Sequence, residues 1–258
     1  MTWPAPFAEF AGRAVLVTGA ATGIGAAVAT AFAACGAHVA LHYNRSAGPA
    51  ETLRDAIIAA GGTASLFQAD LADATAAGRL IEAVAGELGG LHILINNAGD
   101  TFARQPVADT APADYQRSLD LNFGATFSLC RAAIPHFRQQ GYGTIVNTSS
   151  ISARLGGSAG SVLYAAAKGA VSSFTRGLAR ELAPEGIRVN AVAPGVVETA
   201  IHRHTPAAVF AGFREAIPLG RIGTPEECAG AYLFLASERL ASFITGQVLE
   251  VNGGHAMN

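Results

Sequence analysis

The chain holds a tyrosine and its only lysine four residues apart. Sixteen of its 17 Lys and Arg residues are arginines, and the one lysine is Lys168. It follows Tyr164, and the intervening stretch is apolar, so on a helix the two side chains would lie one turn apart on the same face. Such a spacing usually marks an ordinary surface pair. The apolar surroundings and the solitary lysine favour a shared functional site instead.

A lysine beside a tyrosine can turn the phenol into an acid–base catalyst. A phenol has a pKa of about 10, and lowering it by about 3 units requires roughly 4 kcal/mol. A cation at about 4 Å supplies about that much at an effective dielectric constant of roughly 20. We therefore expect Lys168 to lower the pKa of Tyr164, which would act as general acid in a reduction and as general base in an oxidation.

Two serines, Ser149 and Ser150, follow the expected strand 144–148. Serines at the end of a strand are usually loop formers. A hydroxyl at this place could also donate to a substrate oxygen that gains negative charge during hydride transfer. The sequence thus offers an acid–base group, a cation and a hydroxyl donor for chemistry at a C–O bond.

Short apolar runs alternate with helical stretches along the chain, and these elements must position the site. Strands that are apolar on both faces and separated by helices are typical of a parallel sheet covered on both sides. We predict an α/β single domain over residues 1–258: a doubly wound Rossmann fold with a seven-stranded parallel sheet that binds ligands at the carboxyl ends of its strands. The expected strands are 13–18, 39–42, 64–69, 92–95, 144–148, 187–192 and 248–251. The expected helices are 26–34, 51–60, 73–88, 112–138, 163–183, 206–215 and 225–236.

A glycine-rich turn lies between the first expected strand and the first expected helix. Its sequence is Thr18-Gly19-Ala20-Ala21-Thr22-Gly23-Ile24-Gly25. The N–H groups and the dipole at a helix N-terminus favour a negative pyrophosphate, and glycine leaves no Cβ in its way. Gly19 would make the tight turn, and Gly23 and Gly25 would allow close approach and helix packing. The alternative is a simple N-cap loop, which the strand before and the helix after disfavour.

The turn after the second expected strand indicates which dinucleotide fits. An acid there would bind the adenosine ribose of NAD, whereas an arginine would accommodate the phosphate of NADP. The turn holds Asn44, Arg45 and Ser46, and no acid lies within 41–50. Because arginine suits phosphate well, the sequence favours NADP(H), with NAD(H) as the second cofactor. The alternative is that Arg45 is an ordinary solvated loop charge.

Composition excludes several other classes of function. The 258 residues are half apolar and 14% charged, with a net charge of −2, so the chain lacks the basic stripe that nucleic acid requires. It also lacks an apolar run of about 18 residues that could cross a membrane. Met1-Thr2-Trp3-Pro4 does not resemble the start of a signal peptide, so a cytoplasmic protein is predicted. Cys35, Cys130 and Cys228 have no disulfide or metal-ligand spacing, so free thiols and no metal are expected.

Taken together, the motifs resemble the short-chain dehydrogenase/reductase family over nearly the whole chain. The resemblance is greatest to bacterial members similar to 3-oxoacyl-carrier-protein reductases and sugar dehydrogenases, which also end in segments similar to 243–247 and 252–254. The motifs that carry it are Thr18-Gly19-x-x-x-Gly23-Ile24-Gly25, Asn96-Asn97-Ala98-Gly99, Asn122, Ser150, Tyr164-x-x-x-Lys168 and Pro194-Gly195.

The resemblance implies a role for each matching residue. Tyr164 would be the acid–base group, Lys168 would bind the nicotinamide ribose and lower the tyrosine pKa, Ser150 would steady the substrate oxygen, and Asn122 would position a relay water. Ser150 precedes Tyr164 by one residue more than is common, and the extra residue falls in the loop 156–160. Other positions would hold the cofactor: Gly19, Thr22, Gly23, Ile24, Gly25, Asn44, Arg45, Ser46, Asp70, Leu71, Asn96, Asn97, Ala98, Gly99, Pro194, Gly195, Val197 and Thr199.

Substrate and assembly are less defined. The segment 196–221 is weakly periodic and predicted to be a substrate lid. An anionic or polyol substrate would suit the polar candidates, although each could be simply solvated. Family members are commonly homotetramers, and Gly169 and Ala170 would permit close helix packing. A non-catalytic NADP(H)-binding regulator and a structural subunit are the rival interpretations. The candidate substrate residues are Arg104, Arg154, His202, Arg203 and His204.

Overall fold

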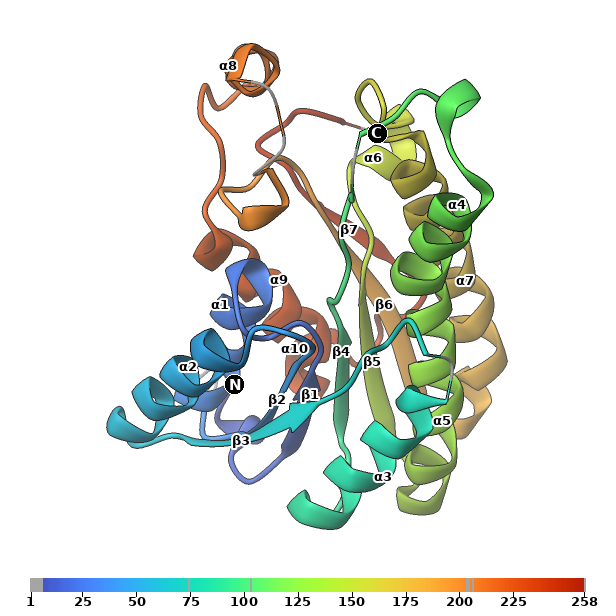
Figure 1. Cartoon of the computed structure of the whole chain (residues 1–258). Helices are drawn as coiled ribbons and strands as arrows, with labels where there is room; N and C mark the ends of the chain where they lie inside the picture. The colour runs from blue at the N-terminus through green and yellow to red at the C-terminus, as the bar shows by residue number, and fades with distance from the viewer. Residues whose placement is uncertain (1–6, 74, 103, 203–204, 206, 258) are drawn as a thin grey trace.

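A seven-stranded parallel sheet forms the centre of the protein (Figure 1). The computed structural model describes residues 7–73, 75–102, 104–202, 205 and 207–257, so Met1–Pro4, Arg203 and His204 lie outside the described residues. Every neighbouring pair of strands runs parallel, in the order β3-β2-β1-β4-β5-β6-β7. The strands are β1 (Ala14–Val17), β2 (His38–Tyr43), β3 (Thr63–Gln68), β4 (Ile93–Asn96), β5 (Gly143–Thr148), β6 (Ile187–Pro194) and β7 (Val248–Val251).

Helices cover both faces of the sheet, as the apolar strands require. One buried core lies between the sheet and α1 with α9, and a second lies on the opposite face under α3, α5 and α7 (Figure 1). The predicted α/β fold with its parallel sheet is confirmed. The helices are α1 (Gly23–Ala34), α2 (Ala47–Ala59), α3 (Ala76–Leu88), α4 (Pro112–Leu119), α5 (Ala125–Gln140), α6 (Ser152–Leu155), α7 (Val162–Leu182), α8 (Ala207–Ala216), α9 (Pro225–Ala236) and α10 (Glu238–Ala241).

The strand order reverses between β1 and β4. The chain runs outward from β1 through β2 to β3, and then returns to pair β4 with the other side of β1. In a doubly wound sheet this reversal opens a crevice at the carboxyl ends of the strands. The fold therefore places the glycine turn after β1 and the segment 97–99 after β4 at the same edge.

The predicted helix 112–138 is wrong as a continuous element. A π-helical turn, Asp120–Gly124, separates α4 from α5, and α5 continues to Gln140. Within the turn, Asn122 is fully buried and its Nδ2 donates to Ser118 O at 3.0 Å. Single π-helical turns inside helices frequently occur at functional sites. The interruption thus aims the Asn122 side chain into the protein rather than along an ordinary helical face.

Two helices begin earlier than predicted. α1 starts at Gly23 and not at 26, and α2 starts at Ala47 and not at 51. Glycine is a weak helix former, so propensity alone places the start of α1 after Gly25. The sheet and the glycine turn override that preference, and the N-terminus of α1 faces the crevice.

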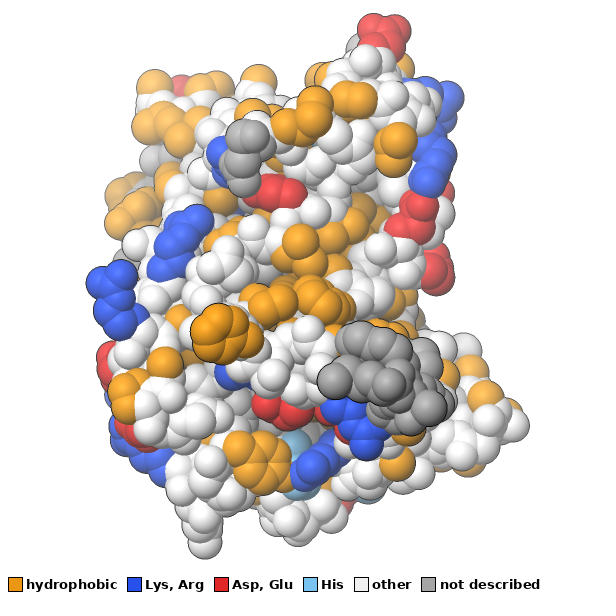
Figure 2. Space-filling model, turned by 180° about the vertical axis from the view of Figure 1, so that it is seen from behind, with side chains coloured by type: hydrophobic (Ala, Val, Ile, Leu, Met, Phe, Trp, Pro, Cys, Tyr) orange, Lys and Arg blue, Asp and Glu red, His pale blue; other side chains and the backbone are white. Residues whose placement is uncertain are grey.

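Several predicted absences can be compared with the described part of the chain. There, no helix is long and apolar enough to cross a membrane, and no group of His, Cys, Asp and Glu could hold a metal ion. All three cysteines are free thiols. On the face in Figure 2, the described basic side chains lie in separate small groups beside acidic and neutral ones and form no continuous basic band.

Candidate active site

Tyr164 and Lys168 lie together at the carboxyl edge of the sheet, on α7. Lys168 is 2% exposed; its Nζ lies 5.7 Å from the centre of the Tyr164 ring and donates to Thr148 O at the end of β5, 2.8 Å away. Both side chains line a cavity of about 250 Å³ beside the ends of β1, β4 and β5. The structure therefore brings together the pair that the spacing predicted.

The expected fall of the Tyr164 pKa below its ordinary value is not found in this arrangement. Burial raises the pKa of Tyr164 to about 12, although the hydrogen bond with Ser150 lowers it; the charge of Asp100 raises it further. Burial is the dominant influence, and the Lys168 Nζ, 5.7 Å from the ring centre and held by Thr148 O, does not outweigh it. Burial also lowers the pKa of Lys168 to about 8. At neutral pH the phenol is protonated, which is the form that can donate a proton.

The two serines after β5 point to different places. The Ser150 hydroxyl forms a hydrogen bond with the Tyr164 phenol and accepts one from Ser152 N at 3.1 Å. The Ser149 hydroxyl turns toward α7, where it lies 2.6 Å from Ser172 Oγ and donates to Lys168 O at 3.1 Å. The geometry favours Ser150 as the hydroxyl beside the phenol and gives Ser149 a role in fixing α7.

Asn122 lies next to Lys168 and ties the π-helical turn to the loop after β4. Its Nδ2 donates to Asp100 O at 2.9 Å, and its Oδ1 accepts from Asp100 N at 3.1 Å. Gly99 lies between the two side chains: a Cβ at Gly99 would stand 2.8 Å from Asn122 Oδ1 and 3.4 Å from Lys168 Nζ. The glycine at this position therefore keeps the amide oxygen and the ammonium close together.

The glycine turn after β1 needs its glycines. Gly19 and Gly23 have positive φ angles of 62° and 57°, which favour glycine, and a Cβ at Gly25 would collide with Gly19 O. The Thr22 side chain makes no capping hydrogen bond, and the first turn of α1 contains no acid. Gly19, Thr22, Gly23 and Ile24 line the same cavity as Tyr164. A pyrophosphate fits this turn by both shape and charge.

The segment after β4 is fixed to this turn by Thr18, whose role the sequence did not indicate. Thr18 Oγ1 accepts from Asn97 N at 2.9 Å and from Ala98 N at 3.0 Å. Asn97 Nδ2 in turn donates to Thr18 O at 2.9 Å. Its neighbour Asn96 is buried in the sheet, where Nδ2 donates to Asn147 Oδ1 at 2.9 Å. Asn97, Ala98 and Gly99 thus form one wall of the cavity, whereas Asn96 fixes β4 to β5.

The predicted nucleotide turn lines a second cavity of about 800 Å³ that is continuous with the glycine turn. Asn44, Arg45 and Ser46 contribute from the end of β2, and Asp70 and Leu71 from the end of β3. Gln68 Nε2 donates to Asn44 O at 3.2 Å and thereby links the two segments. All five predicted residues therefore surround one space, at the adenosine end that the fold implies.

The segment after β6 borders the cavity that Tyr164 and Lys168 line. Gly195 N donates to Val251 O at 2.8 Å, and a Cβ at Gly195 would stand 2.7 Å from Asn252 Cα, so the two segments require glycine there. Val197 pairs with Gly223 as an isolated bridge. Thr199 lies against Gly23 in the glycine turn. Pro194, Gly195, Val197 and Thr199 all line the cavity.

The predicted substrate residues make different contacts in the structure. Arg104 hydrogen-bonds Ser158 Oγ through Nη1 and donates to Thr205 Oγ1 at 3.2 Å through Nη2, so it joins the segment after β4 to the predicted lid. Arg154 lies 3.8 Å from Glu250 in an ion pair. His202 ends a short 3₁₀ helix, Ala200–His202. Among the candidates that the structure describes, Arg104 connects two segments that border the site.

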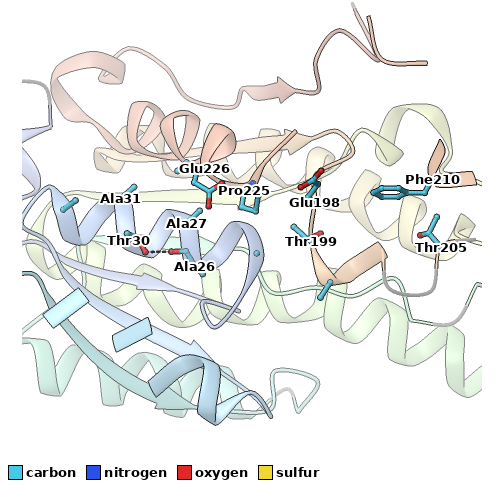
Figure 3. A pocket seen from close by; sticks show the side chains of 14 residues that line it. Ala26, Ala27, Thr30, Ala31, Glu198, Thr199, Thr205, Phe210, Pro225 and Glu226 are labelled. Atoms are coloured by element: carbon cyan, nitrogen blue, oxygen red, sulfur yellow. Dashed lines mark hydrogen bonds between the residues drawn. The ribbon is translucent and has the colours of Figure 1, made fainter. Parts of the chain in front are cut away.

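A groove of about 1010 Å³ runs beside the predicted lid, between α1, α9 and α8 (Figure 3). In the close-up, Ala27 and Ala31 project from α1 toward one end, and Phe210 and Thr205 lie at the other. Gly23, Thr199 and Ala200 line both this groove and the cavity beside Tyr164. The predicted lid therefore borders the site and leaves the groove between α1, α9 and α8 open.

Known proteins resemble this chain in sequence and in structure. A family model described as enoyl-(acyl carrier protein) reductase matches residues 19–256. The 3-oxoacyl-[acyl-carrier-protein] reductase of Synechocystis sp. is 38% identical over 248 residues, which cover 95% of this chain and 97% of that protein. These matches extend over nearly the whole length of both chains.

Two solved structures share the fold. A short chain dehydrogenase from Burkholderia cenocepacia J2315, solved in complex with NADP, is 37% identical, with a TM-score of 0.88 and coverage of 95% of this chain and 98% of that one. The NADH-dependent reductase A1-R′, responsible for alginate metabolism, is 34% identical, with a TM-score of 0.90 and coverage of 97% and 100%. With the glycine turn and the sheet order, these matches show that the chain belongs to the short-chain dehydrogenase/reductase family and is an oxidoreductase of the alcohol–carbonyl class that binds a pyridine nucleotide.

Proposed function

We propose that this protein is an NADP(H)-preferring oxidoreductase that interconverts a small-molecule carbonyl and an alcohol, with Tyr164 as its acid–base group. The observation that carries the proposal is the convergence of the phenol, the Lys168 ammonium and the Ser150 hydroxyl on the cavity that the glycine turn also lines. Each of these groups has a separate task at a C–O bond.

In the direction of reduction, Tyr164 donates its proton to the carbonyl oxygen. The raised pKa keeps the phenol protonated at neutral pH, so the acid is in its working form. Ser150 donates a hydrogen bond to the same oxygen and stabilises the negative charge that develops on it. In oxidation, the same groups work in reverse, with Tyr164 accepting the proton of the alcohol.

Lys168 and Asn122 support this proton transfer. The ammonium is held at Thr148 O and lies beside the Tyr164 ring, where its charge stabilises a phenolate that has given up its proton. Asn122 Oδ1 faces the same space across Gly99. We expect Asn122 to position a water through which a proton from the solvent returns to Tyr164, while the Lys168 charge stabilises the phenolate.

The described residues fit a nicotinamide dinucleotide. The glycine turn would hold the pyrophosphate, Asp70 and Leu71 the adenine, and Pro194, Gly195, Val197 and Thr199 the carboxamide end. When bound, the nicotinamide supplies or accepts the hydride. Asn97, Ala98 and Gly99 would line the cofactor between these ends.

Preference for NADP(H) rests on Arg45 together with Asn44 and Ser46. These residues line the cavity at the adenosine end, and the turn 43–46 contains no acid that would repel the 2′-phosphate. Arg45→Ala should raise the KM for NADPH roughly 10- to 100-fold, as loss of a charged hydrogen bond implies, and leave the KM for NADH nearly unchanged. Steady-state kinetics with both cofactors measures this ratio, and an unchanged ratio would refute the preference.

A panel of carbonyl compounds tests the activity. NADPH oxidation followed at the nicotinamide absorbance, with acyl thioesters, sugars and small ketones as substrates, should give turnover for at least one class. Tight NADPH binding without turnover on any member would favour a non-catalytic regulator over an enzyme.

We further propose that residues 1–258 form one domain, in which residues 196–221 are a lid over the substrate.

We also propose that the chain assembles as a homotetramer. Phe127 on α5 is 44% exposed and stacks edge to face on Phe174 of α7, while Phe243 is fully exposed before β7. Exposed aromatic side chains of this kind are typical anchors between protein chains. Light scattering on the purified protein should give four times the chain mass, and a monomer would contradict the assembly.

A further inference from the structure

His42 is a buried histidine in β2 that joins the two parts of the dinucleotide cavity. Its side chain is 2% exposed. Gly19 N, at the first glycine of the turn after β1, donates to the Nδ1 atom of the ring at 3.1 Å. The Nε2 atom lies 3.2 Å from Ala69 O, at the end of β3. The two nitrogen atoms therefore contact two different segments.

These contacts require one form of the imidazole. A backbone N–H can only donate and a carbonyl can only accept, so Nδ1 must be unprotonated and Nε2 must carry the proton. A second proton on the ring would remove the acceptor that holds Gly19. Burial lowers the pKa of His42 to about 4, against smaller upward effects of Ala69 O and of the nearby Asp70 carboxylate. The neutral ring is thus the form present near neutral pH.

The backbone around His42 reinforces the same junction. Ala20 N donates to His42 O at 2.9 Å, and Ala69 N donates to Tyr43 O at 3.1 Å. His42 lines the cavity between the glycine turn and the turn 44–46. Three segments that surround the adenosine end therefore meet at this one residue.

We propose that His42 is a positioning residue for the dinucleotide: its neutral imidazole fixes the amide of Gly19, and with it the start of the glycine turn, relative to Ala69 and the adenine-binding segment. The proposal rests on the proposed function, because it concerns the affinity for NADPH. Nothing in it requires His42 to touch the reacting atoms, so turnover at saturating cofactor should be unaffected.

A second histidine provides a control at the opposite end of β1. Ala14 N, at the start of this strand, donates to His92 Nδ1 at 2.9 Å. The contact is of the same kind as that of Gly19 with His42. His92 lies at the amino edge of the sheet, however, away from the residues that line the dinucleotide cavity.

Two substitutions distinguish the contributions of the hydrogen bonds made by the two nitrogen atoms of His42. In His42→Asn, the amide oxygen can stand near the place of Nδ1 and accept from Gly19 N. In His42→Gln, the amide nitrogen can stand near the place of Nε2 and donate to Ala69 O, but the acceptor for Gly19 is lost. His92→Gln removes the equivalent acceptor at the other end of the strand.

Titration of the purified proteins with NADPH, followed by its fluorescence, measures the dissociation constant. We expect His42→Gln to raise it at least tenfold, His42→Asn to stay within about threefold of the wild type, and His92→Gln to leave it unchanged. The kcat at saturating NADPH should stay within about twofold in all variants. Long-range ¹H–¹⁵N spectra should show His42 as the Nε2–H tautomer from pH 6 to 8.

Equal affinity of His42→Gln and the wild type would overturn the proposal, as would an equal loss in His42→Asn and His42→Gln or an Nδ1–H tautomer. A joint fall of kcat and cofactor affinity in His42→Gln would also contradict it, because that result indicates general structural damage. Failure of the wild type to bind NADPH would instead refute the proposed function.

Discussion

Two buried cations lie at opposite edges of the same sheet and have different surroundings. The ammonium of Lys168, at the carboxyl edge, donates one hydrogen bond to a described residue, at Thr148 O. Arg188, at the amino end of β6, is 7% exposed and surrounded by acceptors. These are the oxygens of Leu235, Ala236, Ser237, Glu238, Thr144 and Ile244.

The difference separates a structural cation from one available for chemistry. Arg188 uses its fixed fork of donors to close the end of α9 and the start of α10, and its partner Glu238 compensates the charge at 2.7 Å. Lys168 is buried without a carboxylate partner in the described ion pairs and faces a cavity. A cation kept at such a place despite its desolvation is a candidate for function. The comparison predicts opposite effects of the same substitution at the two positions.

Lys168→Met should cause a large loss of activity. Removal of the ammonium should lower kcat by roughly 10²- to 10⁴-fold, the usual range for a group that supports proton transfer. Because burial disfavours the charged form, with a pKa lowered to about 8, the melting temperature should be equal to or above that of the wild type. Kinetics and calorimetry on one preparation measure the kcat and the melting temperature. A strongly destabilised variant would mean that Lys168 is a structural cation like Arg188.

Arg188→Met should lower stability and leave turnover nearly unchanged. Loss of the guanidinium orphans several buried carbonyls, so the free energy of unfolding should fall by about 3 to 4 kcal/mol. The kcat of the folded fraction should stay within about twofold, because none of the hydrogen-bond partners described for Arg188 lines the cavity. Denaturant unfolding measures the first quantity. Retained stability with lost turnover would break the distinction between the two edges.

His42 should make the free energy of unfolding depend on pH, with a smaller effect than the Arg188 substitution. The pKa of His42 is lowered from 6.5 to about 4 in the folded protein. Between these values the unfolded chain binds the extra proton, so stability is full above pH 6.5 and is lost as the pH falls toward 4. The loss from this group should be up to about 3 kcal/mol. Unfolding curves of the wild type and His42→Asn give the contribution as a difference, and parallel pH profiles would contradict it.

Prediction from sequence was most complete where burial or a fixed spacing determines the outcome. Strands β1 and β4 are buried along their whole length, and their short apolar runs identified them. Tyr164 and Lys168 share a cavity because four residues make about one helical turn. The glycine turn was recognisable because positive φ angles demand glycine at fixed positions.

Other features depend on contacts that a single sequence does not encode. The π-helical turn at 120–124 differs from an α-helix by one inserted residue, and periodicity does not show it. His42 lies in an apolar strand, where sequence alone does not distinguish a positioning histidine from an ordinary core residue. The pKa of Tyr164 follows from burial and from the actual place of Lys168, and both were unknown until the elements were assembled.

The central claim is that one phenol, Tyr164, moves the proton. Another tyrosine, Tyr232 on α9, is fully buried; its hydroxyl lies 2.9 Å from Thr148 Oγ1, and it serves as the matched control. NADPH turnover with the best carbonyl of the panel should fall roughly 10²- to 10⁴-fold in Tyr164→Phe, with cofactor affinity retained, and stay within about threefold in Tyr232→Phe. Equal turnover of Tyr164→Phe and the wild type would contradict the account.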